Sequence, residues 1–267
     1  MRVSEQMRVR QAVVYGNLAV LTDRYGPGPG LAGLEMKVFS QNGEDGVLAE
    51  IFHRIGTGTK YFVEFGVSEG REGNSVLLAD VYGWSGLFIE GAPERFGDLA
   101  YKYAGIPRVV TRQEMVTAAN IERILHDADV PIQLDLLSID IDSNDYWVWQ
   151  AITTHRPRVV VCEYNGAIDP TSALTQPYAP AEGWDRTEYF GASLKALVDL
   201  GSHKGYTLVH TDLTGTNAFF VLQELADAFV DCIPVPARRA VAGFSDFRHR
   251  ADESRRAYQT PDPAVRP

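Results

Sequence analysis

Short apolar runs recur along most of the chain, and the segments between them have apolar residues at helical spacing. Residues 47–55 are typical, because their apolar side chains recur at intervals of three or four positions. The apolar runs predict seven strands, at residues 61–66, 86–90, 108–111, 134–141, 158–164, 206–210 and 217–222. Helices are expected at 74–83, 93–104, 118–128, 145–155 and 190–204.

The order of these elements predicts an α/β fold. Strands that alternate with helices form a mostly parallel sheet. The last two predicted strands are joined only by Thr211-Asp-Leu-Thr-Gly-Thr216, which is too short for a crossover helix, so they must pair as an antiparallel hairpin. Five βα units closed by an antiparallel hairpin predict the Rossmann-like, seven-stranded fold of class I S-adenosylmethionine (SAM) methyltransferases.

Three parts are expected along the chain. Residues 1–37 form an N-terminal extension, with a helix at 1–23 and a Gly/Pro linker at 26–30 that cannot continue helical hydrogen bonding. Residues 38–250 form the α/β domain. The Pro-rich, basic composition of residues 251–267 predicts a flexible tail.

Composition narrows the classes of function. The chain has 267 residues, 45% of them apolar, and no apolar run reaches the roughly 18 residues of a membrane span. Two cysteines give neither a disulfide framework nor a zinc spacing, and polar residues interrupt the first apolar segment, so a cytoplasmic protein without a secretory signal is expected. A net charge of −10 argues against a nucleic-acid partner. A small-molecule substrate fits better, and a homo-oligomer remains open.

The stretch FVEFGVSEG, residues 62–70, has two interpretations. As G-x-S-x-G it matches the nucleophile elbow of a serine hydrolase with Ser68 as nucleophile. As E-x-G-x-x-x-G at a strand-to-helix turn it matches a loop whose glycines allow close approach of a nucleotide. The hydrolase interpretation lacks an upstream oxyanion-hole motif and places its nucleophile after the first strand, although His203, His210 and Asp185 keep its chain order open.

Glu90 favours the nucleotide interpretation. This acid ends the second predicted strand, twenty residues past Gly70, where a carboxylate can accept the two hydroxyls of a ribose. NAD is the rival to SAM, but the G-x-G-x-x-G pattern that a pyrophosphate needs is missing. SAM is therefore the expected cofactor.

Four motifs in order resemble the FkbM-like family of SAM-dependent methyltransferases. They are Ser40-Gln-Asn-Gly-Glu-Asp45, FVEFGVSEGREGNS, GWSGLFIEG and LLSIDIDSNDYWVW, within residues 38–165. The resemblance implies a Rossmann-like fold, SAM as methyl donor and O-methylation in natural-product or sugar chemistry. The family's Asp-Val-Glu-Gly is replaced here by Asp140-Ile-Asp-Ser143, so the acceptor side departs from the family's pattern.

The predicted cofactor-binding residues gather in loops after the strands. Glu64 would hold the glycine turn or the SAM ammonium, because an acid inside an apolar strand needs a partner. Asn74 would cap a helix or meet the SAM carboxylate, and Gln113 lies where an adenine contact is expected. The full set is Gln41, Glu64, Gly66, Ser68, Gly70, Asn74, Glu90, Gln113 and Asp140.

An acidic edge is expected where the fourth and fifth strands end. Asp142, Glu163 and Asn165 offer the oxygen ligands that Mg²⁺ prefers, and the alternative is a polar pocket for the SAM amine and substrate hydroxyls. Asp142 and His210 are the expected catalytic residues, the first through the metal and the second as a general base, with a structural role as the alternative for His210.

Residues 166–189 lack periodicity and are expected to cap the acceptor. The predicted reaction is methyl transfer to a small molecule, more readily at oxygen than at nitrogen. Two further classes stay open: a SAM-consuming enzyme that does not methylate, and a binding protein without catalysis.

Overall fold

The computed structural model describes residues 30–181, 183–232 and 252–267. The helix expected at 1–23 and nearly all of the Gly/Pro linker lie outside these residues. Within the described part of the chain, no helix combines the length and apolar character needed to cross a membrane.

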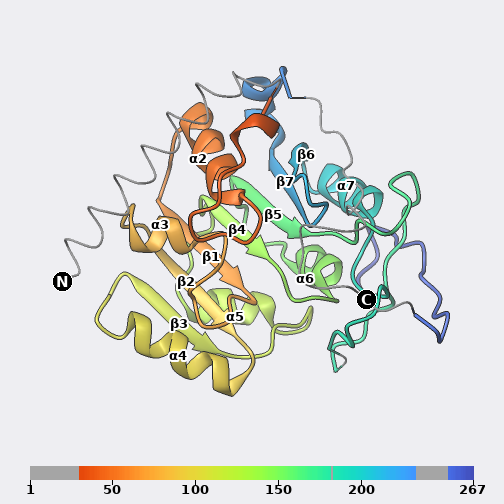
Figure 1. The fold of residues 1–267 in the computed structure, drawn as a ribbon, viewed down its shortest axis with the longest axis horizontal. Coiled ribbons are helices and arrows are strands. Elements are labelled where there is room, and N and C mark those ends of the chain that lie inside the picture. The colour runs from red at the N-terminus through yellow and green to blue at the C-terminus, as the bar shows by residue number, and fades with distance from the viewer. Residues whose placement is uncertain (1–29, 182, 233–251) are drawn as a thin grey trace.

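A single seven-stranded sheet runs through the molecule (Figure 1). Its order is β3-β2-β1-β4-β5-β7-β6, and only β7 runs antiparallel to its neighbours. All seven predicted strands and the C-terminal hairpin are confirmed. The strands are β1 (Tyr61–Phe65), β2 (Ser85–Glu90), β3 (Val109–Gln113), β4 (Leu136–Ile139), β5 (Val159–Glu163), β6 (Tyr206–Thr211) and β7 (Asn217–Leu222).

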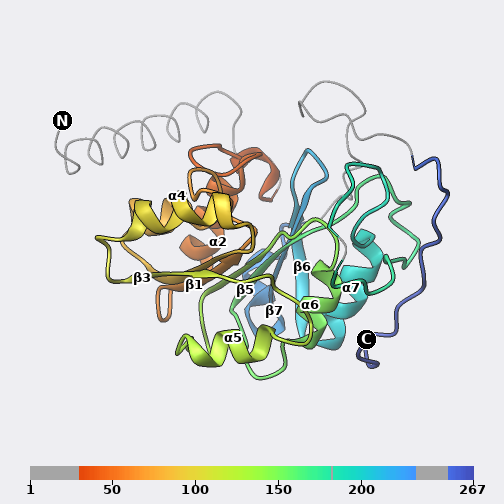
Figure 2. The same ribbon diagram turned by 90° about the horizontal axis from the view of Figure 1, so that it is seen from below.

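Helices cover both faces of the sheet (Figure 2). One face carries α2 (Glu44–Ile55), α3 (Val76–Asp80) and α4 (Pro93–Tyr103). The other carries α5 (Ile121–Asp127), α6 (Asp145–Ala151) and α7 (Leu194–His203). Two 3-10 helices, η1 (Ala32–Leu34) and η2 (Gln223–Phe229), complete the described elements.

Several helices are shorter than the apolar pattern predicts. Helix α3 begins at Val76 and not at residue 74, and the backbone N–H groups of Asn74 and Ser75, just before it, donate to the Glu64 side chain. Helix α6 ends at Ala151, after which Ile152 takes an extended conformation. Local propensity alone does not fix such boundaries.

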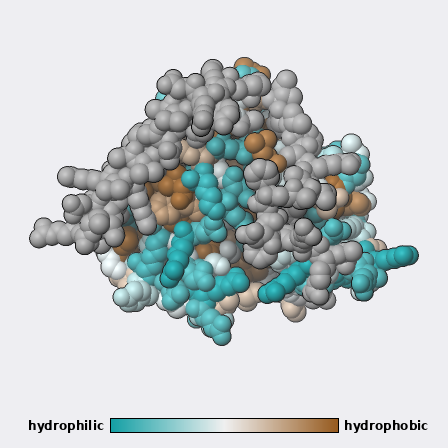
Figure 3. All heavy atoms as spheres, in the orientation of Figure 1, coloured by the Kyte–Doolittle hydropathy of each residue, from teal (hydrophilic) through white to brown (hydrophobic). Residues whose placement is uncertain are grey.

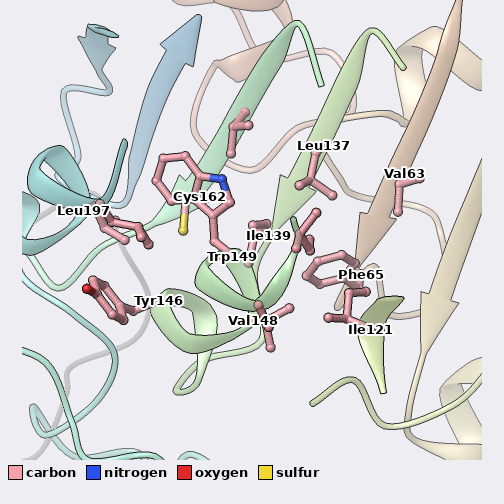
Figure 4. Packing of buried hydrophobic residues seen from close by; sticks show 14 of the residues in the cluster. Val63, Phe65, Ile121, Leu137, Ile139, Tyr146, Val148, Trp149, Cys162 and Leu197 are labelled. Atoms are coloured by element: carbon pink, nitrogen blue, oxygen red, sulfur yellow. The ribbon is translucent and has the colours of Figure 1, made fainter. Parts of the chain in front are cut away.

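The core has two layers, one on each side of the sheet. Side chains from β1, β4 and β5 pack against α5, α6 and α7 in one layer (Figure 4). In the other layer, Phe62 and Phe88 pack tilted with their ring centroids 4.7 Å apart, beneath α2 and α4. Strands buried on both faces explain why their sequences are continuous apolar runs. On the face drawn in Figure 3, hydrophobic residues show only as separate groups among hydrophilic ones.

The ends of the described chain belong to this packing. Leu31 and Met36 are buried in the core, so the packing continues across the domain boundary expected at residue 38. In the described part of the tail, Gln259 pairs with Thr175 through two backbone hydrogen bonds of 2.8 and 2.9 Å. Gln150 also donates to three carbonyl groups of residues 262–265. These specific polar contacts are not visible in the tail's composition.

Candidate active site

The connections of the sheet change direction between β1 and β4. From β1 the chain proceeds outward to β2 and β3, whereas from β4 it proceeds to β5 on the other side. Open α/β sheets bind ligands at the carboxyl ends of the strands at such a switch point. Gly66 lies there with φ at +83°, and a Cβ at this position would sit 1.6 Å from the Asp140 carbonyl oxygen. Only glycine fits, as the loop interpretation requires.

Glu64 fixes the loop that follows β1. Its two carboxylate oxygens accept the backbone N–H groups of Asn74 and Ser75, each at 2.8 Å. The side chain is 4% exposed, and burial raises the pKa of Glu64 to about 7 although both hydrogen bonds lower it. The Asn74 side chain donates to the Ser138 hydroxyl at 3.0 Å. Glu64 therefore fixes the backbone where the loop after β1 leads into α3.

Glu90 ends β2 on the same edge of the sheet. Its carboxylate accepts the backbone N–H of Ser68 at 2.8 Å and that of Ala92 at 2.7 Å, and the residue is 6% exposed. A carboxylate has about four acceptor positions, so two bonds to the backbone orient it and leave a lone pair on each oxygen. This arrangement suits a diol that donates two hydroxyl hydrogens.

Ser68 has a backbone role in this loop. Its φ of +54° is unusual for a residue other than glycine, and its hydroxyl accepts a hydrogen bond from Arg95 at 3.1 Å. Within the described residues no histidine contacts Ser68, so the geometry lacks the base that a serine nucleophile requires. Gly70, with φ at +69°, packs where a Cβ would meet Leu99 at 2.6 Å.

The motif Ser40-Gln-Asn-Gly-Glu-Asp45 forms a second loop against the glycine loop. Asp45 accepts three consecutive backbone N–H groups, those of residues 38–40, at 2.7–2.8 Å. The backbone N–H of Gly73 donates to the Phe39 carbonyl, which joins the two loops. Gln41 lies exposed in this loop. Asp45 was missed as a site-building residue, although its motif carried the family resemblance.

Three carboxylates meet beyond β4 and β5. Oxygen atoms of Asp140, Asp142 and Glu163 all lie within 4.8 Å of one another. Burial, and then the neighbouring Asp142 carboxylate, raise the pKa of Asp140 well above its ordinary value. Asp145 shapes the loop by accepting the N–H groups of Ile141 and Ser143, at 2.8 and 3.0 Å. The site therefore gathers negative charge where a cation would be stabilised.

Asn165 lies near this acidic group along the chain but contacts different partners. It is fully buried, and its amide nitrogen donates to the carbonyls of Glu188 and Phe190 and to the Tyr258 hydroxyl, at 2.9–3.1 Å. Its amide oxygen accepts the N–H of Ala167 at 3.0 Å. The metal ligands expected from the sequence were Asp142, Glu163 and Asn165. The structure places Asp140 beside the first two, and the Asn165 side chain binds the backbone of the segment that follows β5.

Asn217 is an amide that the sequence analysis missed. It is directly opposite Glu163 in the antiparallel pairing of β5 with β7 and is 2% exposed. Its nitrogen donates to Glu44 at 2.8 Å, and its oxygen has no hydrogen-bond partner among the described residues. No spacing in the sequence links residues 163 and 217, because the pairing depends on the hairpin register.

The segment after β5 is anchored over this edge. Asn144 exchanges two hydrogen bonds of 3.1 Å with the backbone of Ala179, and the Trp147 indole donates to the Gln176 carbonyl at 2.9 Å. The tail holds the segment from outside, with the Tyr258 ring 4.7 Å from that of Tyr189. Residues 176–179 are therefore fixed beside Asn144 and Trp147, at the start of α6.

His210 and Gln113 have other surroundings. His210 is buried, and its Nε2 lies 3.0 Å from a Glu35 carboxylate oxygen that also accepts the N–H of Leu213. This contact joins the N-terminal segment to the β6–β7 hairpin. Gln113 is exposed at the end of β3, opposite Glu90 in the strand pairing.

The sheet has the Rossmann-like strand order of class I methyltransferases. That statement follows from the order of the strands and the direction of β7. No protein-family model matches the chain, and no curated protein matches it.

Solved structures similar to this chain include several methyltransferases. The O-methyltransferase from Bacillus cereus in complex with SAH is 14% identical, with a TM-score of 0.44 over 77% of this chain and 95% of that one. The O-methyltransferase TomG from Streptomyces achromogenes, involved in tomaymycin synthesis and in complex with SAM, is 16% identical, with a TM-score of 0.42 over 78% and 88%. The N-terminal domain of EvdMO1 with SAH bound is 13% identical, with a TM-score of 0.43 over 65% and 76%.

Proposed function

We propose that this chain is a SAM-dependent methyltransferase that acts on a small-molecule acceptor. The observation that carries the proposal is the Glu90 carboxylate, which is oriented by two backbone N–H groups at the end of β2, beside the switch point of the sheet. A buried acid fixed in this way suits the ribose diol of an adenosine.

The residues of the switch point fit the rest of this cofactor. Gly66 keeps the loop backbone within close reach of a ligand, and Glu64 holds the loop in its turn. The cofactor carries positive charge on its sulfonium and ammonium groups, and the carboxylates of Asp140, Asp142 and Glu163 lie at the same edge. When bound, SAM supplies an electrophilic methyl group to a nucleophilic acceptor.

The acceptor is proposed to be a hydroxyl group, in natural-product or sugar metabolism, as the FkbM-like resemblance implies. Asp142 and Glu163, joined by Asp140, would hold Mg²⁺ through carboxylate oxygens. Such an ion would ligate the acceptor oxygen and lower its pKa. Residues 166–189 would cap the acceptor, because Asn144 and Asn165 hold parts of this segment beside these loops.

Replacing Glu90 tests the proposed cofactor. Glu90→Ala removes the acceptor of two hydroxyl hydrogen bonds and is expected to weaken SAM binding by about 2–4 kcal/mol. Isothermal titration calorimetry with SAM measures the affinity, and circular dichroism checks that the variant is folded.

Glu94→Ala is the matched control, since Glu94 is an exposed acid in the first turn of α4, four residues from Glu90. It should bind SAM like the parent protein. Unchanged affinity in folded Glu90→Ala would refute the proposed cofactor site.

A further inference from the structure

A pocket opens at the opposite edge of the sheet, next to the amino ends of β4, β5 and β6. Its volume is about 420 Å³, and Gln133, Pro157 and Tyr206 mark the three strand ends around it. The size falls within the range of roughly 300–1,000 Å³ typical of small-molecule sites. The pocket and the acidic group lie at opposite ends of β4. A strand of four residues is about 13 Å long.

The lining of the pocket is basic. His155, Arg156, His203, Lys204 and Arg266 line it, and no Asp or Glu is found among the described residues of the lining. This contrasts with the chain as a whole, whose net charge is −10. The pocket therefore has three cationic side chains, Arg156, Lys204 and Arg266. Two acids lie against the lining: Glu224 pairs with Arg156, and Glu122 accepts the N–H groups of Thr153 and Thr154. Lys204 and Arg266 are the cations that remain to attract an anion.

The basic side chains differ in their existing partners. Arg156 forms a two-pronged ion pair with Glu224, at 2.7 and 2.9 Å. Lys204 donates to the carbonyl oxygen of Ile152, at the end of α6. Arg266 donates to the Thr153 hydroxyl at 3.1 Å and forms no ion pair within the part of the chain that the structure describes. Arg266 is thus the cation with most capacity for an additional anion.

The remaining lining offers apolar surface and one buried acceptor. Ile132 is 59% exposed and provides this apolar surface, whereas Trp149, Leu200 and Tyr206 are almost fully buried in the pocket wall. Gln150 uses its nitrogen on the tail carbonyls, while its side-chain oxygen is buried and has no hydrogen-bond partner among the described residues. A buried acceptor left in this state favours a ligand that brings a donor.

We propose that this pocket binds a small organic anion, with a carboxylate or phosphate group paired to Arg266 and Lys204 and an apolar portion against Ile132. The chain's tail, residues 263–266, forms one wall of this second site. The site lies apart from the proposed methyl-transfer site and does not depend on its chemistry.

Calorimetric titration with 4-hydroxybenzoate and with phenyl phosphate tests the proposal. Both carry a ring, and the pair distinguishes a carboxylate site from a phosphate site. At least one should bind the parent protein with a Kd below about 10 mM, a weak affinity typical of such small probes. Arg266→Gln should weaken that binding roughly five- to tenfold, because it removes a charge-assisted contact.

Arg255→Gln is the matched control, because Arg255 is exposed in the same tail and does not line the pocket. It should bind the probe like the parent protein, and saturating SAM should leave the probe's affinity unchanged. The proposal is overturned if neither probe binds below about 10 mM. It is equally overturned if Arg266→Gln binds the probe as tightly as the parent.

Discussion

The aspartates at the two ends of β4 have opposite electrostatic surroundings. Asp135, just before the strand, is fully buried and accepts the N–H groups of Gly58 and Lys60, and Arg158 donates to it at 2.7 Å. Asp140, just after the strand, faces the carboxylates of Asp142 and Glu163. The first acid is neutralised by the protein, whereas the second is surrounded by like charge.

This difference separates a structural acid from a ligand-binding acid. A buried charge that already has a cation and backbone donors contributes to the native fold, and removing one partner leaves the other uncompensated. At Asp140, burial and the neighbouring Asp142 carboxylate instead raise the pKa well above its ordinary value. A bound cation would stabilise the ionised form of Asp140, and strongly shifted pKa values of this kind are typical of functional sites.

Substitution of each aspartate by asparagine tests the comparison and should give the largest effect. Asp135→Asn leaves Arg158 without its carboxylate partner and is expected to lower the free energy of unfolding by about 2–4 kcal/mol. Asp140→Asn removes a carboxylate whose pKa is raised in the folded state. Its stability should lie within about 1 kcal/mol of the parent, on the stabilising side. Urea unfolding at pH 8 measures both.

The pH dependence of the Asp140→Asn effect checks its cause. Because the folded-state pKa is raised, ionising Asp140 costs stability as the pH rises above the ordinary carboxyl pKa. The gain from asparagine should therefore be present at pH 8 and absent near pH 3.8, the ordinary value. Destabilisation by Asp140→Asn equal to that by Asp135→Asn would contradict the distinction.

Much of the fold was predictable because its signals are local. Buried parallel strands have apolar runs bounded by turns, and the short connection Thr211–Thr216 dictates an antiparallel hairpin. The position of Glu90 was predictable for the same reason, since a strand end and an acid suffice to place it at the carboxyl edge.

The remaining features depend on contacts between distant parts of the chain. Asn165 is one example, because its amide contacts carbonyls and a hydroxyl that lie 23–93 residues further on. Likewise, Glu35 lies beside His210 only because the N-terminal segment packs on the hairpin. No residue spacing encodes such pairs, and the register of Asn217 with Glu163 belongs to the same class.

Metal binding tests whether the carboxylates at the carboxyl end of β4 form a ligand site. Manganese, used as a spectroscopic substitute for Mg²⁺, is expected to bind the parent protein, and Asp142→Asn should weaken its binding roughly 10- to 100-fold, as loss of one carboxylate ligand implies. Electron paramagnetic resonance of free Mn²⁺ measures the affinity. Asp98→Asn, an exposed acid in α4, should have no effect.

The companion measurement is SAM affinity in the presence of EDTA, which should stay close to that without chelator because Glu64, Gly66 and Glu90 do not belong to the metal group. If the parent protein does not bind Mn²⁺, the metal site is refuted, and the alternative role of the three carboxylates is to bind positively charged groups of the cofactor and acceptor. In that case Asp142→Asn should weaken SAM binding instead.

Ser68→Ala should have the smallest effect. The backbone N–H of Ser68 donates to Glu90, and alanine retains this group. Within the described residues, the Ser68 hydroxyl contacts only the Arg95 guanidinium. SAM affinity should therefore change by less than about 0.5 kcal/mol, as for surface substitutions generally. Calorimetry measures this change, and a fluorophosphonate probe tests the serine as a nucleophile in the same preparation.

A serine nucleophile would be labelled in the parent protein and not in Ser68→Ala, since the variant lacks the attacking oxygen. Labelling with that pattern would show that Ser68 is a nucleophile. The loop after β1 would then have a functional role, as proposed for Asp140, and not a purely structural one, as for Asp135.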